Sequence, residues 1–215
     1  MSLAVEALVV AGGIFLGRLI SRVMRRRSAA IAVSTAPAAA GDPAPLEDDA
    51  LQGFPCQLGD VVLRRVEGDE AWLAGAMVML EDRAVAALFV APEARGDRGV
   101  YAPGPGETTL MWLAPLPAGE LGLASLLAPG GEPPRTLEHA GRRYERARRL
   151  PVRVERQGTG APSVGKRAIV GEYKAAGTDR VLLVLGSDAV AAWRGVALAE
   201  GSYEVLPGGK ATLEP

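Results

Sequence analysis

Arg180-Val181-Leu182-Leu183-Val184-Leu185 is the stretch that decides the fold, because every residue after the arginine is apolar. An apolar run of this length is typical of a strand that is buried on both faces. Gly186-Ser187-Asp188 follows as a turn, and Ala189 to Trp193 follows as a second, mostly apolar segment. The sequence therefore predicts a central buried strand at 180–185 with another extended segment after the turn.

The same texture extends over residues 53–207, where short apolar runs alternate with glycine-rich and proline-rich turns. Strands at short spacing with hairpin turns are typical of an antiparallel sandwich or barrel. No long amphipathic helix is evident after residue 53, although 120–127 also suits a short helix. We predict a mainly β, antiparallel sandwich or barrel-like domain over 53–207, followed by a tail at 208–215. Its expected extended segments are 61–66, 71–80, 84–90, 100–101, 108–113, 143–147, 151–156, 168–174, 180–185, 189–193 and 201–206.

Residues 1–27 have a different character, because a long apolar run is followed by a cluster of arginines. A hydrocarbon core needs roughly 20 helical residues to cross it. Leu3 to Met24 reaches that length if the arginines at its end extend to the headgroups. We predict one N-terminal membrane helix, a single-pass anchor. Its anchoring residues are Leu3, Leu8, Ile14, Phe15, Arg18, Arg22 and Arg25.

Two other interpretations of this segment remain. Arginines at helical spacing also suit an amphipathic helix that lies on the membrane, and a soluble helix packed on the domain is disfavoured by three glycines. A cleaved signal peptide is disfavoured because no positive charge precedes the apolar run. Since the arginines follow the run, the positive-inside rule places the domain in the cytoplasm, at the inner (cytoplasmic) membrane.

Residues 28–52 are rich in alanine and proline and lack hydrophobic periodicity. Such composition is typical of an extended, disordered tether. The segment ends in the acidic cluster Glu47, Asp48 and Asp49, which we interpret as a solvated linker end rather than a metal site.

The densest charge run is a set of seven arginines between 142 and 156. One interpretation is an anion or partner surface, and the other is a pair of exposed strand faces balanced by Glu145 and Glu155. Nucleic acid is not expected, because the net charge is −1 and Tyr144 is the one aromatic residue in the run. The arginines assigned to the anion or partner surface are Arg146, Arg148, Arg149 and Arg153.

Three features that suggest chemistry have simpler interpretations. Gly160 to Lys166 fits the spacing of a phosphate loop, but Arg167 stands where serine or threonine is needed and a strand-like run follows. His139, the sole histidine, is too few for a multi-histidine metal site. Cys56, the sole cysteine, excludes an internal disulfide and lacks an activating cation nearby. We therefore assign no catalytic, cofactor-binding or metal residue and expect no cofactor.

Several short segments resemble the bacterial family called domain of unknown function 4178. The resemblance covers about residues 55–207 and implies a β fold, with no established reaction or catalytic residue. Ala84 to Val90 departs from it, because the segment has no acidic residue and a single aromatic one, Phe89. The matching segments are Leu58-Gly59-Asp60-Val61-Val62, Trp112-Leu113, His139-Ala140-Gly141-Arg142-Arg143-Tyr144, Gly171-Glu172-Tyr173-Lys174, Val181-Leu182-Leu183, Trp193-Arg194-Gly195 and Tyr203-Glu204-Val205-Leu206.

The sequence favours a membrane-anchored, non-enzymatic interaction module that binds a protein partner or a lipid surface near the inner membrane through strand edges or the arginine-rich hairpin. The alternative is a small-ligand-binding or enzymatic β domain with an unrecognised pocket. A deep pocket that gathers polar side chains such as Asp60, His139 or Glu172 would favour the alternative. A filled core with an exposed apolar or basic face would favour the module.

Overall fold

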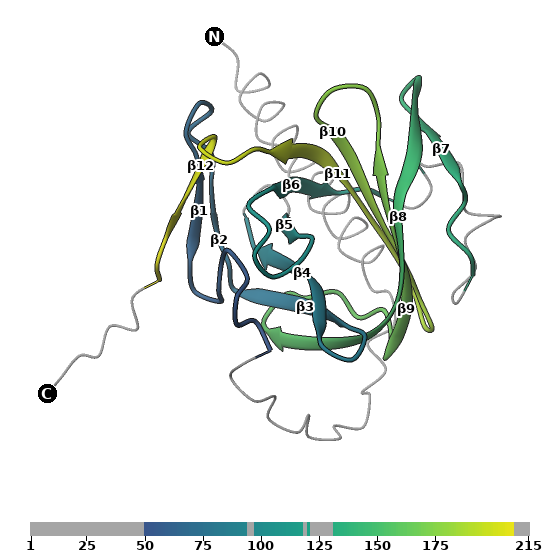
Figure 1. The fold of residues 1–215 in the computed structure, drawn as a ribbon, viewed down its shortest axis with the longest axis horizontal. Coiled ribbons are helices and arrows are strands. Elements are labelled where there is room, and N and C mark those ends of the chain that lie inside the picture. The colour runs from purple at the N-terminus through teal and green to yellow at the C-terminus, as the bar shows by residue number, and fades with distance from the viewer. Residues whose placement is uncertain (1–49, 94–96, 118–119, 121–130, 209–215) are drawn as a thin grey trace, which may run out of the picture. The chain divides into compact units, whose positions relative to one another are not determined.

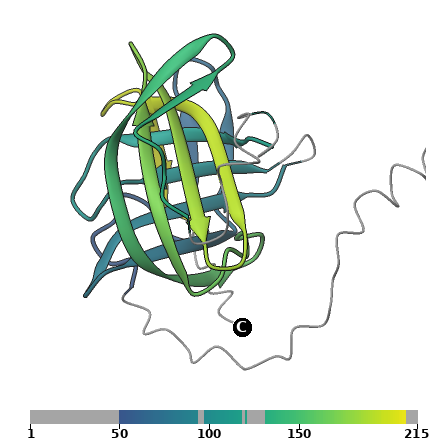
Figure 2. The ribbon, with the colours of Figure 1, turned by 90° about the vertical axis from the view of Figure 1, so that its right-hand side faces the viewer.

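The computed structural model describes residues 50–93, 97–117, 120 and 131–208, which form a closed antiparallel β-barrel with a smaller sheet packed beside it (Figures 1 and 2). The predicted mainly β, antiparallel fold is confirmed, and it is a barrel rather than a sandwich. The predicted anchor helix and nearly all of the predicted linker and tail lie outside the described residues. In the parts of the chain that are described, no helix has the length and apolar content needed to cross a bilayer.

Eight strands close the barrel, and β7 extends it as an added strand on β8. A separate three-stranded sheet has the order β12-β1-β2. All neighbouring strands in both sheets are antiparallel. Around the barrel the order is β3 (Gly75–Leu80), β4 (Ala84–Ala91), β5 (Arg98–Ala102), β6 (Leu110–Pro115), β11 (Val190–Leu198), β10 (Asp179–Gly186), β9 (Arg167–Lys174) and β8 (Arg142–Gly158), which pairs with β3; the remaining strands are β7 (Thr136–His139), β1 (Val61–Arg64), β2 (Glu70–Trp72) and β12 (Tyr203–Leu206).

Strand β10 is central and buried, as its apolar run predicts. Successive side chains of a strand point to opposite faces, so an unbroken apolar run needs a core on each side. Leu182 and Val184 point into the barrel. Val181 and Leu183 point outward into a second cluster with Tyr144 of β8.

The three-stranded sheet covers the outer face of β3 to β6. Its inward residues, which include Val62 and Ala71, join one buried cluster with Phe89 and Trp112 of the barrel wall. The guanidinium carbons of Arg64 on β1 and Arg98 on β5 lie 5.7 Å and 5.4 Å from the centroid of the Trp112 ring. Both contacts are within the range of a cation–π interaction.

The structure corrects two sequence predictions around β8. The segments 143–147 and 151–156 are not separate, because β8 runs through both over 17 residues. Pro151 interrupts the sequence pattern but not the strand. It lies between the part of β8 that pairs with β7 and the part that pairs with β3, where β9 is the single strand neighbour. Proline is tolerated there because fewer ladder hydrogen bonds need its missing N–H. Strand β7 was not predicted.

A third correction concerns the extended segment predicted at 100–101, which is longer in the structure. Strand β5 begins at Arg98, so Gly99 lies within the barrel wall. A Cβ atom at Gly99 would lie 3.2 Å from Leu88 Cδ1 and 3.4 Å from Trp193 Cδ1. The absence of a side chain at Gly99 therefore leaves space for the side chains of Leu88 and Trp193.

The two ends of the described domain meet at Asp60. Its carboxylate accepts hydrogen bonds from the backbone N–H of Gln57 at 2.7 Å and of Gly208 at 3.0 Å. Leu51, which falls in the predicted linker, is buried in the cluster under the three-stranded sheet. Asp60 thus has a structural role, because it joins the N-terminal part of the domain at Gln57 to its C-terminal part at Gly208.

Candidate binding surfaces

The barrel interior is filled by side chains and crossed by one hydrogen bond. Inward-facing residues from all eight strands form a single buried cluster. The hydroxyl of Tyr101 on β5 donates to Oε1 of Glu172 on β9 at 2.6 Å. The order β5-β6-β11-β10-β9 separates these strands by four steps in a ring of eight, so the bond joins opposite walls.

Arg148 lies beside this bond, directly across from Glu172 in the β8–β9 ladder. Its Nη1 donates to the carbonyl oxygen of Pro103 at 2.6 Å and lies 3.4 Å from Glu172 Oε1. Burial raises the pKa of Glu172, and the contacts with Tyr101 and Arg148 oppose that rise. Burial is also the main reason that the pKa of Tyr101 is well above its ordinary value. Tyr101, Glu172 and Arg148 thus form a polar cluster that connects opposite walls of the barrel. We call this cluster the polar lock.

The arginine run is not one surface. Arg149 Nε and Nη2 donate to the two carboxylate oxygens of Glu132 at 2.6 Å and 2.8 Å. Arg146 also contacts Glu132, at 3.1 Å. These hydrogen bonds, first those from Arg149, lower the pKa of Glu132. With Arg148 placed at the lock, Arg153 is the member of the predicted surface with no acidic side chain within 4.0 Å among the described residues.

The remaining sequence features stand apart from one another. Loop 160–166 joins the antiparallel strands β8 and β9, and Val164 from it is buried in the barrel cluster. Nδ1 of His139 lies 3.3 Å from the carbonyl oxygen of Glu120. Cys56 is buried, and its burial, with a smaller effect of Asp60, raises the pKa of its thiol to about 12. Such a thiol stays protonated at neutral pH and is a poor nucleophile.

Asp60, His139 and Glu172 therefore do not line one pocket. Asp60 bonds backbone amides, His139 contacts a backbone carbonyl, and Glu172 lies in the polar lock. Over the described ranges, no three histidine, cysteine, aspartate or glutamate residues gather as metal ligands would.

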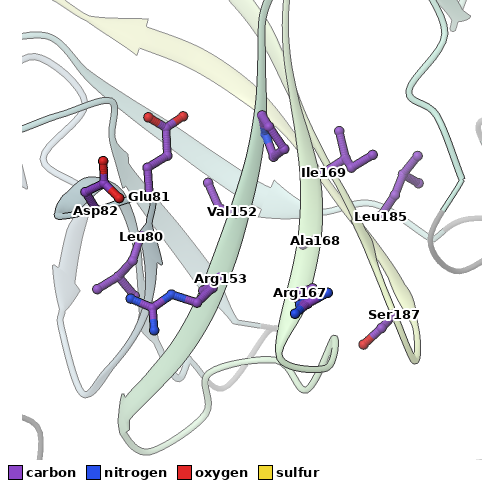
Figure 3. Close-up of a pocket in the computed structure, with 11 residues that line it drawn as sticks. Leu80, Glu81, Asp82, Val152, Arg153, Arg167, Ala168, Ile169, Leu185 and Ser187 are labelled. Atoms are coloured by element: carbon purple, nitrogen blue, oxygen red, sulfur yellow. The ribbon is translucent and has the colours of Figure 1, made fainter.

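A pocket of about 600 Å³ lies between the β3–β4 turn and strands β8 and β9 (Figure 3). Glu81 and Asp82 come from the turn, while Arg153 and Arg167 come from neighbouring strands. Apolar side chains line the rest of the pocket, apart from Ser187. These are Leu80, Pro151, Val152, Ala168, Ile169 and Leu185.

The outer face of the three-stranded sheet carries a row of apolar side chains. Leu206 of β12, Val61 of β1 and Trp72 of β2 are directly opposite one another in the two ladders. Trp72 is 69% exposed and Leu206 is 43% exposed. The next row places Glu204 and Glu70 on the two sides of Leu63. We call these six residues the outer face.

A second pocket, of about 500 Å³, adjoins the outer face at Trp72. Its other lining residues are Leu58, Gly59, Leu73, Ala74 and Pro92. Sequence reasoning missed the outer face, although a signal was present. In Glu70-Ala71-Trp72 the alternation of a strand places Glu70 and Trp72 on the same side. Because a carboxylate seldom lies in a core, a tryptophan on the same side of the strand is expected to be exposed as well.

Comparison of the chain with protein-family models, with curated proteins and with solved structures finds no match. The resemblance to domain of unknown function 4178 therefore stays a prediction.

Proposed function

We propose that the protein is a non-enzymatic interaction module, tethered to the cytoplasmic membrane by residues 1–27 and binding a protein partner through the outer face. The observation that carries this proposal is the apolar row of Trp72, Val61 and Leu206, in which Trp72 and Leu206 are exposed, on a domain whose barrel interior is filled. Large exposed apolar residues that are contiguous and rimmed by charge are typical of protein-binding sites.

The partner's chemistry follows from the charges around the apolar row. Glu70 and Glu204 both lie on the outer face, and one of them, Glu204, has a cation nearby, Arg65 at 3.6 Å. Complementary charge on the partner sets its register and suppresses other partners. We expect a segment that presents apolar side chains together with lysine or arginine. The pocket beside Trp72 is large enough to receive one of its apolar side chains.

Photo-crosslinking in membranes tests the docking face. Benzoylphenylalanine in place of Trp72 in the full chain should capture one protein, within a peptide that combines apolar and basic residues. Charge reversal by Glu70→Lys with Glu204→Lys should abolish this capture. A matched control places the same probe at Arg156, which is exposed on β8 outside the outer face. The proposal is overturned if the Trp72 probe reacts with lipid alone, with nothing, or equally well after charge reversal.

Cell fractionation tests the tether separately. The full chain should sediment with membranes in the absence of detergent, and a chain that lacks residues 1–27 should stay in the supernatant. Recovery of the full chain in the supernatant would remove the membrane from the proposal and leave the protein partner in place.

A further inference from the structure

Two arginines from neighbouring strands line the pocket between the β3–β4 turn and strands β8 and β9. Arg153 of β8 is directly opposite Arg167 of β9 in the ladder, and both are exposed. Like charges directly opposite each other destabilise a sheet. Other arginines of β8 avoid such a cost through acidic neighbours, as the contacts of Arg149 with Glu132 show. A bound anion would remove the repulsion between Arg153 and Arg167.

The opposite side of the same pocket carries negative charge. Glu81 and Asp82 follow β3 in the turn, and both are exposed. Arg153 pairs with Leu80, the residue before them. Despite this proximity, no carboxylate oxygen of Glu81 or Asp82 lies within 4.0 Å of a nitrogen of Arg153 or Arg167 in the described structure. Figure 3 shows the carboxylates directed away from the two guanidinium groups.

The floor between these charges is apolar. Val152, Ala168 and Leu185 are buried, and Leu80 and Ile169 are partly covered. The volume of about 600 Å³ falls within the range of ordinary small-molecule sites. A ligand that satisfies the whole pocket therefore needs an anionic group, a cationic group and an apolar portion.

We propose that this pocket binds a zwitterionic amphiphile, with its phosphate on Arg153 and Arg167 and its ammonium group near Glu81 and Asp82. Guanidinium groups bind phosphate through paired hydrogen bonds, which is why arginine is common at such sites. The apolar portion of the ligand covers the floor. A membrane lipid with a phosphoethanolamine headgroup and a free phosphoethanolamine compound share this chemistry. The pocket shares no residue with the outer face, so this proposal and the proposed function stand or fall separately.

Calorimetric titration of the purified full chain in nonionic detergent tests the proposal with three probes. Dihexanoyl phosphatidylethanolamine should bind, O-phosphoethanolamine should bind about tenfold more weakly because it lacks the apolar portion, and dihexanoyl phosphatidylglycerol should bind more weakly because it lacks the ammonium group. Equal affinity for the first two probes would exclude the lipid source. Preference for phosphatidylglycerol would contradict the role of the carboxylates, and no binding of any probe would overturn the proposal.

Single substitutions divide the site into its two halves. Arg153→Gln and Arg167→Gln should each weaken phosphatidylethanolamine binding at least about tenfold. Asp82→Asn should weaken phosphatidylethanolamine binding but leave phosphatidylglycerol binding unchanged, which a general loss of folding would not do. Arg156→Gln, an exposed arginine of β8 that does not line the pocket, is the matched control and should bind as the parent chain does. A loss in this control equal to that in Arg153→Gln would show nonspecific charge attraction and overturn the site.

Discussion

The two faces of the three-stranded sheet differ in what covers them. On the inner face, Trp112 of the barrel wall is 3% exposed and lies close to the guanidinium groups of Arg64 and Arg98. On the outer face, Trp72 is 69% exposed. Both tryptophans lie on strands and both have apolar neighbours in register. The difference shows that, among the described residues, one side of this small sheet is covered and the other is exposed. The exposed side is the one to which we assign the partner.

Trp112→Ala should have the largest effect on stability, because it empties the space between the sheet and the barrel. Replacing a buried tryptophan by alanine typically costs about 3–5 kcal/mol in free energy of unfolding. Denaturant unfolding of the full chain in detergent, followed by near-ultraviolet circular dichroism, measures the change. A loss below about 1 kcal/mol would show that the inner face is not a packed core.

Tyr101→Phe should cost less, about 1–3 kcal/mol, because it leaves the buried carboxyl of Glu172 without its closest hydrogen-bond donor. The same denaturant series measures it. Tyr203→Phe, which removes a hydroxyl that donates to the carbonyl oxygen of Thr108 on an exposed side, is a matched control and should cost less. An equal cost for the two variants would argue against a lock across the barrel.

Glu172→Gln should change how stability depends on pH. Burial raises the pKa of Glu172 in the folded state above its ordinary value of 4.5. The folded carboxyl therefore holds its proton more tightly than the unfolded one, and this stabilisation is full below pH 4.5 and is lost as pH rises through the raised pKa. The unfolding free energy of the variant minus that of the parent should thus increase with pH. A difference that stays constant or falls between pH 4 and pH 8 would contradict the raised pKa.

Trp72→Thr should have the smallest effect on stability, within about 0.5 kcal/mol, because the side chain is mostly exposed and threonine suits a strand. The same variant should lose most of its partner binding, measured by crosslinking from a probe at Val66, in the turn between β1 and β2. Stability lost to the same extent as in Trp112→Ala would make the outer face a structural surface instead of a binding one.

The strand content of the domain could be predicted from local patterns, but the closure of the barrel could not. The apolar run of β10 and the turn after it are local signals, and both are present in the structure. Pairing of β3 with β8 joins residues 75–80 to residues 153–158, a distance in sequence at which no local pattern acts. The continuity of β8 through Pro151 could not be predicted either. Whether a strand tolerates a proline depends on its neighbouring strands, which the sequence does not show.

The candidate surfaces were predicted less well, for a related reason. The arginine run was visible in the sequence, but its acidic partners Glu132 and Glu172 are distant in the chain. Arg153 could be separated from Arg148 and Arg149 only after those partners were placed. Tyr101 and Glu172 are separated by 71 positions, so no local sequence pattern predicts the hydrogen bond between them.

The pairing of β1 with β12 has a consequence for biosynthesis. Residues 61–64 pair with residues 203–206, so the pairing of β1 with β12 cannot form until residues 203–206 have been synthesised. Pairings between distant segments slow folding. On a ribosome, β1 emerges long before β12, and the surface beneath the small sheet is not fully covered until residues 203–206 have emerged. We expect the nascent chain to depend on chaperones during this interval, and truncation before residue 203 to yield an aggregation-prone product.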